Sequence, residues 1–158
     1  MVSLIVAIGR NNLIGKGNEL PWHYKEDMKY FKEKTMNKKV IMGEATFKSI
    51  LGYINKPLPK RTSVIATLTD YSYPGIETTN DIIKYLKEFP KEEEIFIIGG
   101  KIIYDLTLEL ADRLYITHVD KDYQGDVYFK EIDYSNYTKI SEKINNELNF
   151  SVYERNDS

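Results

Sequence analysis

Short apolar runs alternate along the first two thirds of the chain with segments whose apolar residues recur at helical spacing. The runs predict strands at 2–8, 39–42, 62–67 and 94–100. The segments between them predict helices at 24–35, 44–51, 80–89 and 101–109, the third with Thr79 as N-cap. The predicted strands are almost continuously apolar, which indicates a sheet with helices on both faces.

After residue 110 the pattern changes. The segments 113–119, 137–144 and 148–155 read as strands with no helical segment between them. We therefore predict an α/β fold with a mostly parallel, twisted central sheet, an antiparallel C-terminal edge and helices on both faces. Residues 1–158 are expected to form a single domain. Ligands of such folds bind beyond the carboxyl ends of the strands, so the functional residues are expected there.

One acidic residue of the predicted helix 24–35 lies on its apolar side. Tyr24, Met28 and Phe31 form an i, i+4, i+7 stripe, and Asp27 falls inside it. Burying an unpaired carboxylate costs on the order of several kcal/mol, so an acid there needs a partner or a function. The other interpretation is a partly buried acid that interacts with the helix dipole.

The loop before this helix has the composition of a mobile lid. Gly15, Gly17 and an asparagine precede Leu20. The segment lacks the third glycine of a dinucleotide fingerprint and leads into another loop, so it does not predict a Rossmann turn. Trp22, the only tryptophan, is by itself more typical of a core anchor.

Two strand-to-helix turns are candidates for phosphate binding. Gly43 opens one helix, which continues through Thr46, and Gly99 and Gly100 open another. Free N–H groups and the positive dipole end at a helix N-terminus suit a phosphate, and two neighbouring sites suit a pyrophosphate. Each turn by itself is equally compatible with glycines that only allow tight packing.

Arg61 ends the segment KPLPKR just before a strand. A rigidly presented guanidinium can bind a ligand carboxylate through two hydrogen bonds, although the segment by itself favours a solvated loop charge. We interpret His118 as structural because it lies in a predicted strand without a second metal ligand at suitable spacing, and His23 as exposed.

Bulk composition excludes several classes of function. The net charge of −2 gives no general attraction to nucleic acid or to an anionic membrane. The absence of cysteine excludes disulfides and zinc–thiolate sites, and no metal site is expected. The apolar run 2–8 has no basic flank and is too short to span a membrane, so we expect a cytoplasmic protein. We also expect a monomer.

Seven stretches taken together resemble the dihydrofolate reductase family along nearly the whole chain. They are SLIVAIG, LIGKGNELPWHYKEDMKYFK, VIMGEATFKSI, PLPKR, IIGGKIIY, LYITHV and GDVYF. The most specific is the segment from Gly15 through Phe31, in which the loop, the Pro-Trp pair and the helix acid have the family's spacing.

The resemblance implies the roles of the substrate-side residues. Asp27 would bind N3 and the 2-amino group of the pterin, assisted by the Thr117 hydroxyl, and Trp22 would help to hold an ordered water. Arg61 would bind the glutamate α-carboxylate. The remaining substrate-side positions are the carbonyls of Ile5 and Ile98 and the side chains of Met28, Phe31, Ile50 and Leu58.

The resemblance also implies a nicotinamide cofactor, NADPH, and dihydrofolate and antifolates as ligands. Its implied cofactor-side residues are Ala7, Ile14, Gly15, Gly43, Thr46, Thr67, Gly99, Gly100, Lys101 and Tyr104, with Leu20 over the nicotinamide. The Gly99–Gly100 peptide would be cis, and Asp126 would steady the mobile loop. Hydride would pass to C6 of dihydrofolate, and water admitted past Leu20 would supply the proton to N5.

Three positions depart from the family pattern on the cofactor side. Glu44 replaces the usual arginine after Gly43, and Leu68 and Ile102 stand where polar or basic residues commonly meet cofactor phosphates. Lys101 can compensate in part. These departures make the use of NADH plausible.

Two alternatives remain open. One is a reductase of the same fold that acts on a ribosylated pyrimidine in flavin synthesis, which would not require Asp27, Trp22 and Thr117 together. The other is a nucleotide-binding module without catalytic activity, in which a buried helix acid would have no purpose.

Overall fold

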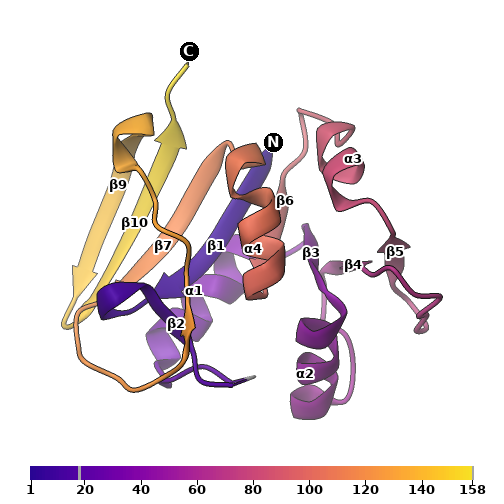
Figure 1. Ribbon diagram of the computed structural model, residues 1–158, viewed down its shortest axis with the longest axis horizontal. Coiled ribbons are helices and arrows are strands. Elements are labelled where there is room, and N and C mark those ends of the chain that lie inside the picture. The colour runs from indigo at the N-terminus through magenta and orange to yellow at the C-terminus, as the bar shows by residue number, and fades with distance from the viewer. Residues whose placement is uncertain (18, 158) are drawn as a thin grey trace.

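The computed structural model describes residues 1–17 and 19–157; Asn18 of the predicted lid and Ser158 lie outside the described residues. An eight-stranded sheet runs through the molecule in the order β5-β4-β3-β6-β1-β7-β10-β9 (Figure 1). The strands are β1 Val2–Ile8, β3 Lys39–Gly43, β4 Thr62–Ala66, β5 Glu77–Thr79, β6 Ile95–Gly99, β7 Arg113–Val119, β9 Tyr137–Asn145 and β10 Leu148–Arg155. The pairs from β5 to β7 are parallel, and β10 pairs antiparallel with both β7 and β9. The predicted antiparallel C-terminal edge is confirmed.

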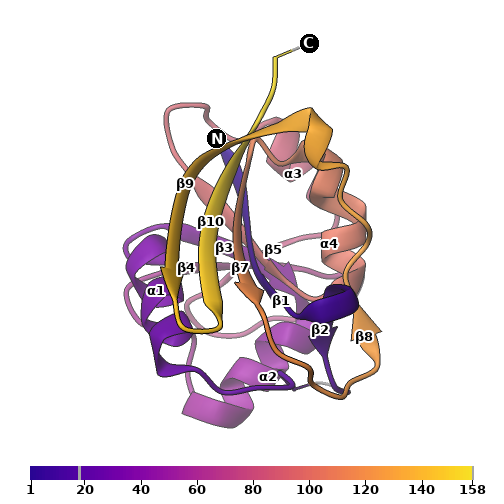
Figure 2. The same cartoon turned by 90° about the vertical axis from the view of Figure 1, so that its left-hand side faces the viewer.

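Helices cover both faces of the sheet, as predicted. They are α1 Lys25–Thr35, α2 Glu44–Ile54, α3 Ile82–Lys87 and α4 Lys101–Thr107, with 3-10 turns at Arg10–Asn12, Leu108–Leu110 and Tyr134–Asn136. Figure 2 shows α3 and α4 on one side of the strongly twisted sheet and α1 on the other. Among the described residues, no helix is long and apolar enough to cross a membrane.

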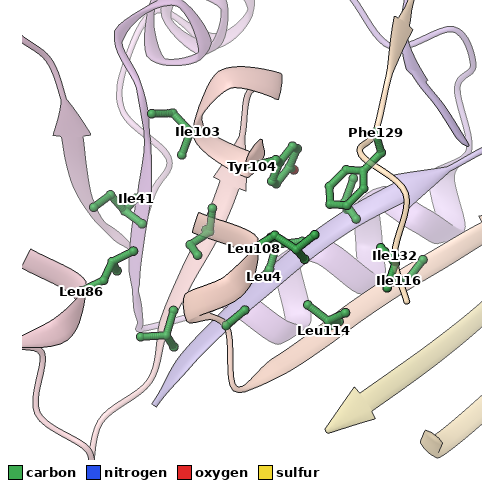
Figure 3. Close-up of a cluster of buried hydrophobic side chains, with 14 of the residues drawn as sticks. Leu4, Ile41, Leu86, Ile103, Tyr104, Leu108, Leu114, Ile116, Phe129 and Ile132 are labelled. Atoms are coloured by element: carbon green, nitrogen blue, oxygen red, sulfur yellow. The ribbon is translucent and has the colours of Figure 1, made fainter. Parts of the chain in front are cut away.

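The largest apolar cluster lies between the sheet and the α3–α4 face (Figure 3). Leu4, Ile41 and Leu114 contribute side chains from three strands, and each is fully buried. Leu86 of α3 and Leu108 after α4 pack onto them. A second cluster, which includes Phe47 of α2, buries the opposite face of the sheet. The strands are almost continuously apolar because both of their faces are buried.

Several predicted boundaries need correction. Thr79 is not the cap of α3: it ends β5, and Asp81 caps the helix by accepting a hydrogen bond from the Lys84 N–H at 3.1 Å. The short strand β5 and the paired strands β2 (Leu13–Gly15) and β8 (Val127–Tyr128) were not predicted. Two or three residues are too few to show a period of two.

Helix α2 is longer than predicted and runs to Ile54 rather than residue 51. Asn55 ends it in the left-handed conformation, with φ +60°, and its N–H bonds to the Leu51 carbonyl at 2.9 Å. Asparagine is one of the few residues that adopt this conformation readily, so it supplies the stop that glycine usually provides.

Candidate active site

A carboxyl–hydroxyl pair connects α1 to the central sheet. Thr117 of β7 donates its hydroxyl to Asp27 Oδ1 at 2.7 Å. Burial raises the pKa of Asp27, and the hydrogen bond from Thr117 opposes that rise. The sequence placed Asp27 on the buried side of the helix, and the structure agrees. The carboxyl is thus desolvated, bonded to one hydroxyl and able to accept further N–H donors.

Trp22 lies just before α1, in the apolar cluster that includes Val119 at the end of β7. Its side chain is 3% exposed, and its Nε1–H has no hydrogen-bond partner among the described residues. A Cβ on Gly9 would lie 2.9 Å from the indole ring, so glycine there permits the ring's close approach to the chain. A buried donor of this kind usually satisfies itself with an ordered water or ligand.

Apolar side chains extend from this point across the second face of the sheet. Phe31, Ile50, Leu58 and Ile98 all pack against the same buried cluster, so the structure brings these four predicted substrate-side residues together. Met28 differs from the predicted stripe, because it is 61% exposed. Tyr30 takes the inner position instead, with its ring centroid 4.6 Å from that of Phe150.

Arg61 immediately precedes β4 and lies next to the C-terminal end of α1. Its Nε donates to the Pro59 carbonyl at 2.9 Å, and its Nη1 donates to the Thr35 hydroxyl at 3.3 Å. Partial burial lowers the pKa of the guanidinium, which nevertheless remains charged. These contacts orient the group and leave other N–H donors for a ligand carboxylate.

The two predicted helix starts meet at adjacent strands. Met42 of β3 pairs with Gly99 of β6, and a Cβ on Gly100 would lie 3.2 Å from the Thr46 hydroxyl. The Gly99–Gly100 peptide is cis. Gly99 has φ +131°, a backbone conformation that residues other than glycine rarely adopt. The backbone therefore favours glycine at position 99, whereas at Gly100 a Cβ would make a tight contact with Thr46.

The predicted nicotinamide-side residues are spread around β1 and the lid. Ile14 is buried in the large cluster and Ala7 packs at the edge of the one around Trp22, whereas Leu20 is 54% exposed. The buried Tyr104 of α4 donates its hydroxyl to the Ile5 carbonyl at 2.9 Å. That bond fixes the carbonyl predicted to face the pterin.

Glu44, in the first turn of α2, is held by two threonines and a lysine. Its Oε1 accepts hydrogen bonds from the hydroxyls of Thr67 at 2.7 Å and Thr69 at 3.1 Å. Its Oε2 lies 2.7 Å from Lys48 Nζ. The Lys48 and Thr67 hydrogen bonds lower the pKa of Glu44, so its negative charge is firmly maintained.

The surroundings of Glu44 are hydroxyl-rich. A hollow beside it is lined by Thr67, Thr69, Thr78, Thr79 and Asn80. Leu68 and Ile102 are 92% and 74% exposed. Lys101 pairs with Asp105 at 3.1 Å. Lys101 and Lys48 are therefore each paired with a carboxylate.

The loop after β7 contacts the lid. Asp126 accepts a hydrogen bond from the Gly17 N–H at 2.8 Å and donates its own N–H to the Gly15 carbonyl at 3.0 Å.

Sequence reasoning did not identify Lys48 as the partner of Glu44. The i, i+4 spacing of Glu44 and Lys48 on a predicted helix was the available signal.

Comparison with known proteins relates the whole chain to one family. The family model described as dihydrofolate reductase matches residues 1–155. The dihydrofolate reductase of Bacillus subtilis is 37% identical and covers 100% of this chain and 96% of its own length. That of Buchnera aphidicola from Acyrthosiphon pisum is 41% identical over 87% of this chain and 84% of its own.

A solved structure has the same fold. The dihydrofolate reductase of Enterococcus faecalis, complexed with NADP(H) and RAB-propyl, superposes with a TM-score of 0.84 at 31% identity. The match covers 99% of this chain and 97% of that one.

Proposed function

This chain belongs to the dihydrofolate reductase family, and we propose that the residues around Asp27 carry the family's reaction. The protein is an NAD(P)H-dependent oxidoreductase that reduces 7,8-dihydrofolate to tetrahydrofolate. The observation that supports this assignment of residues is the pair formed by the desolvated Asp27 carboxyl and the Thr117 hydroxyl.

Asp27 binds and orients the pterin. A carboxylate accepts two parallel N–H bonds, which matches the N3 and 2-amino donors on one edge of the ring. Thr117, which donates to one carboxylate oxygen, fixes the carboxyl's direction. In a site of low dielectric, the negative charge favours proton addition at the pterin N5.

The chain's residues fit a nicotinamide dinucleotide. The Gly99–Gly100 turn lies close to Thr46, where the helix starts offer N–H groups to phosphate. When bound, the cofactor supplies the hydride that reaches C6 of dihydrofolate. Ala7, Ile14, Leu20 and Tyr104 exclude water around the nicotinamide, and Trp22 and Leu20 control the water that protonates N5.

The other end of the substrate contacts α1, α2 and β4. Phe31, Ile50 and Leu58 provide an apolar surface for the aromatic rings, with Met28 at the open side. Arg61 binds the α-carboxylate of the glutamate tail, and antifolates that carry the same tail use the same guanidinium. This arrangement makes the tail's affinity separable from that of the pterin.

The cofactor preference departs from that of a strict NADPH enzyme. The relative from Enterococcus faecalis is complexed with NADP(H), and we expect NADPH to be usable here. Glu44, however, takes the hydroxyls of Thr67 and Thr69 as its own donors and repels a 2′-phosphate. A carboxylate can also accept a hydrogen bond from a ribose hydroxyl. NADPH is therefore expected to have an unusually small advantage over NADH, or none.

The test is the loss of absorbance at the nicotinamide band with dihydrofolate as substrate, with and without an antifolate, for each cofactor. We expect antifolate-sensitive oxidation of both cofactors by a monomeric, cytoplasmic enzyme. No turnover of dihydrofolate, but turnover of a ribosylated pyrimidine, would move the protein to the other reductase of this fold. A preference for NADPH above about 10³-fold, or ~4 kcal/mol, would contradict our interpretation of Glu44.

A further inference from the structure

Two tyrosine hydroxyls join the start of α1 to the loop after β7. The Tyr24 and Tyr123 hydroxyl oxygens are 2.5 Å apart. Tyr24 immediately precedes α1, and its carbonyl accepts the hydrogen bond from the Met28 N–H at 3.1 Å. Tyr123 lies in the middle of loop 120–126, which connects β7 to β8 (Figure 2). The bond therefore reaches the helix that carries Asp27.

The Tyr123 ring also packs on the segment that precedes α1. Its centroid lies 5.4 Å from the Trp22 ring at an interplanar angle of 61°, and 6.3 Å from the Tyr24 ring at 87°. Both geometries are edge-to-face contacts, which favour one relative orientation of the rings. Tyr123 thus fixes both the indole and the helix start.

The turn between β9 and β10 approaches the same point. Burial, the Tyr123 hydroxyl and the Glu147 carboxylate together raise the pKa of Tyr24, so its hydroxyl remains protonated. The Glu147 carbonyl accepts the Asp120 N–H at 2.7 Å. This turn therefore contacts the first residue of loop 120–126.

The two ends of loop 120–126 are fixed separately. At its beginning, Arg10 pairs with Asp120 at 3.0 Å and with Asp122 at 3.2 Å. At its end, Asp126 exchanges hydrogen bonds with Gly15 and Gly17 of the lid. A Cβ on Gly125 would lie 2.4 Å from the Gly15 carbonyl oxygen, so the loop backbone lies directly against the lid.

We propose that Tyr24 and Tyr123 are positioning residues for hydride transfer. Their hydroxyl bond holds the lid, through loop 120–126, in a fixed position relative to the helix that carries Asp27. The inference rests on the proposed function, because Leu20 and Trp22 act on the pterin only in that reaction. Without the bond, the two halves of the site move more independently, and fewer bound complexes have the reacting atoms aligned.

The kinetic test uses Tyr24→Phe, Tyr123→Phe and the double variant, which keep the rings and remove the hydroxyls. We expect single-turnover hydride transfer to fall about 3- to 10-fold. The KM for dihydrofolate should change less than about twofold. The double variant should be no slower than either single variant, because all three lose one shared bond.

Tyr85→Phe is the matched control. Tyr85 lies on α3, and its hydroxyl accepts a hydrogen bond from Lys39 Nζ at 3.2 Å. Its removal should leave hydride transfer unchanged. Equal losses in Tyr85→Phe would attribute the effect to general loosening and overturn the proposal.

Amide hydrogen exchange supplies a readout that does not depend on turnover. Exchange of lid residues 13–17 and 19–20 should be faster in both single variants than in Tyr85→Phe or wild type. Unchanged exchange in the variants would overturn the proposal, whether or not wild type reduces dihydrofolate. Inactivity of wild type with dihydrofolate would instead contradict only the proposed function. Faster exchange with unchanged hydride transfer would also overturn it, because the contact would then be only structural.

Discussion

The two ends of the proposed active site hold carboxylates in opposite electrostatic conditions. Asp27, at the proposed pterin end, is desolvated, has its pKa raised by burial and accepts one hydrogen bond from Thr117. Glu44, at the proposed adenosine end, accepts from Thr67 and Thr69, pairs with Lys48 and has a lowered pKa. One carboxyl thus depends on the ligand for donors, and the other already has them.

This difference indicates where the site is specialised. The pterin end keeps every residue that the family resemblance requires, and the structure brings Asp27 and Thr117 into contact. At the proposed adenosine end, Glu44 stands where the family resemblance implies an arginine, and two threonine hydroxyls donate to it. Changes in Asp27 should therefore affect the chemistry, whereas changes in Glu44 should affect the choice of cofactor.

The largest expected effect is that of Asp27→Asn. The amide keeps the size of the side chain but loses the charge that orients the pterin, so kcat/KM at neutral pH should fall by ~10²-fold or more. Activity should partly return at low pH, where dihydrofolate is itself more readily protonated. Steady-state rates across the pH range measure both effects.

Glu26→Gln is the control for this prediction, because Glu26 is an exposed acid on the same helix. Its kcat/KM should match that of wild type. Near-normal turnover of Asp27→Asn at neutral pH would remove Asp27 from its proposed role and abolish the contrast between the two carboxylates.

The second effect tests how far the substrate side extends. Arg61→Leu should weaken folates and glutamate-bearing antifolates by about 2 kcal/mol, or ~30-fold, because a charge-assisted hydrogen bond is lost. Small diaminopyrimidine inhibitors lack that carboxylate and should bind almost unchanged. Ligand titrations of this variant, with the exposed Lys32→Leu as control, measure the difference. Equal losses for both ligand types would place the tail elsewhere.

The third effect concerns the adenosine end. Glu44→Arg replaces repulsion of a 2′-phosphate by attraction, and the KM for NADPH should fall about 10-fold while that for NADH changes much less. Glu142→Arg is a matched charge reversal, because Glu142 also pairs with a lysine, Lys139, at 2.7 Å but lies on β9. An equal fall in the KM for NADPH in both variants would show that the effect comes from net charge alone.

The sequence predicted the surroundings of Asp27 better than those of Glu44. Asp27 could be predicted because one acid interrupts a helical stripe, and local periodicity is enough to reveal that. The contact between Glu44 and Thr67 joins α2 to the residue after β4, 23 positions away. Such a contact depends on side-chain directions that no local pattern specifies.

Exposure was the least predictable property of the site. Met28 fits an apolar stripe but is 61% exposed, whereas Tyr30 occupies the inner position against Phe150. The rest of the fold covers only part of the apolar side of α1, so periodicity overstates the helix's buried surface. The Tyr24–Tyr123 bond was missed for a different reason, because Tyr123 lies in a loop 99 positions from Tyr24 and no local pattern pairs the two.

The smallest expected effect is on stability and again comes from Asp27→Asn. Burial raises the pKa of Asp27 above its ordinary value near 3.8, so the folded state binds this proton more readily than the unfolded chain. Stability from this group is therefore present below the unfolded pKa and is lost as pH rises through the folded pKa. At neutral pH the charged carboxylate disfavours folding, and the neutral amide, whose oxygen still accepts from Thr117, should raise stability by ~0.5–1 kcal/mol. That gain corresponds to a rise in Tm of about 2 °C for a chain of this size, and it should shrink as the pH approaches 4.

Calorimetry of wild type and Asp27→Asn at pH 7 and pH 4 measures this difference in stability, with Glu26→Gln again as control. A variant less stable than wild type at pH 7 would show that the carboxylate is stabilised within the fold, as Glu44 is, and that the two ends of the site do not differ in this respect.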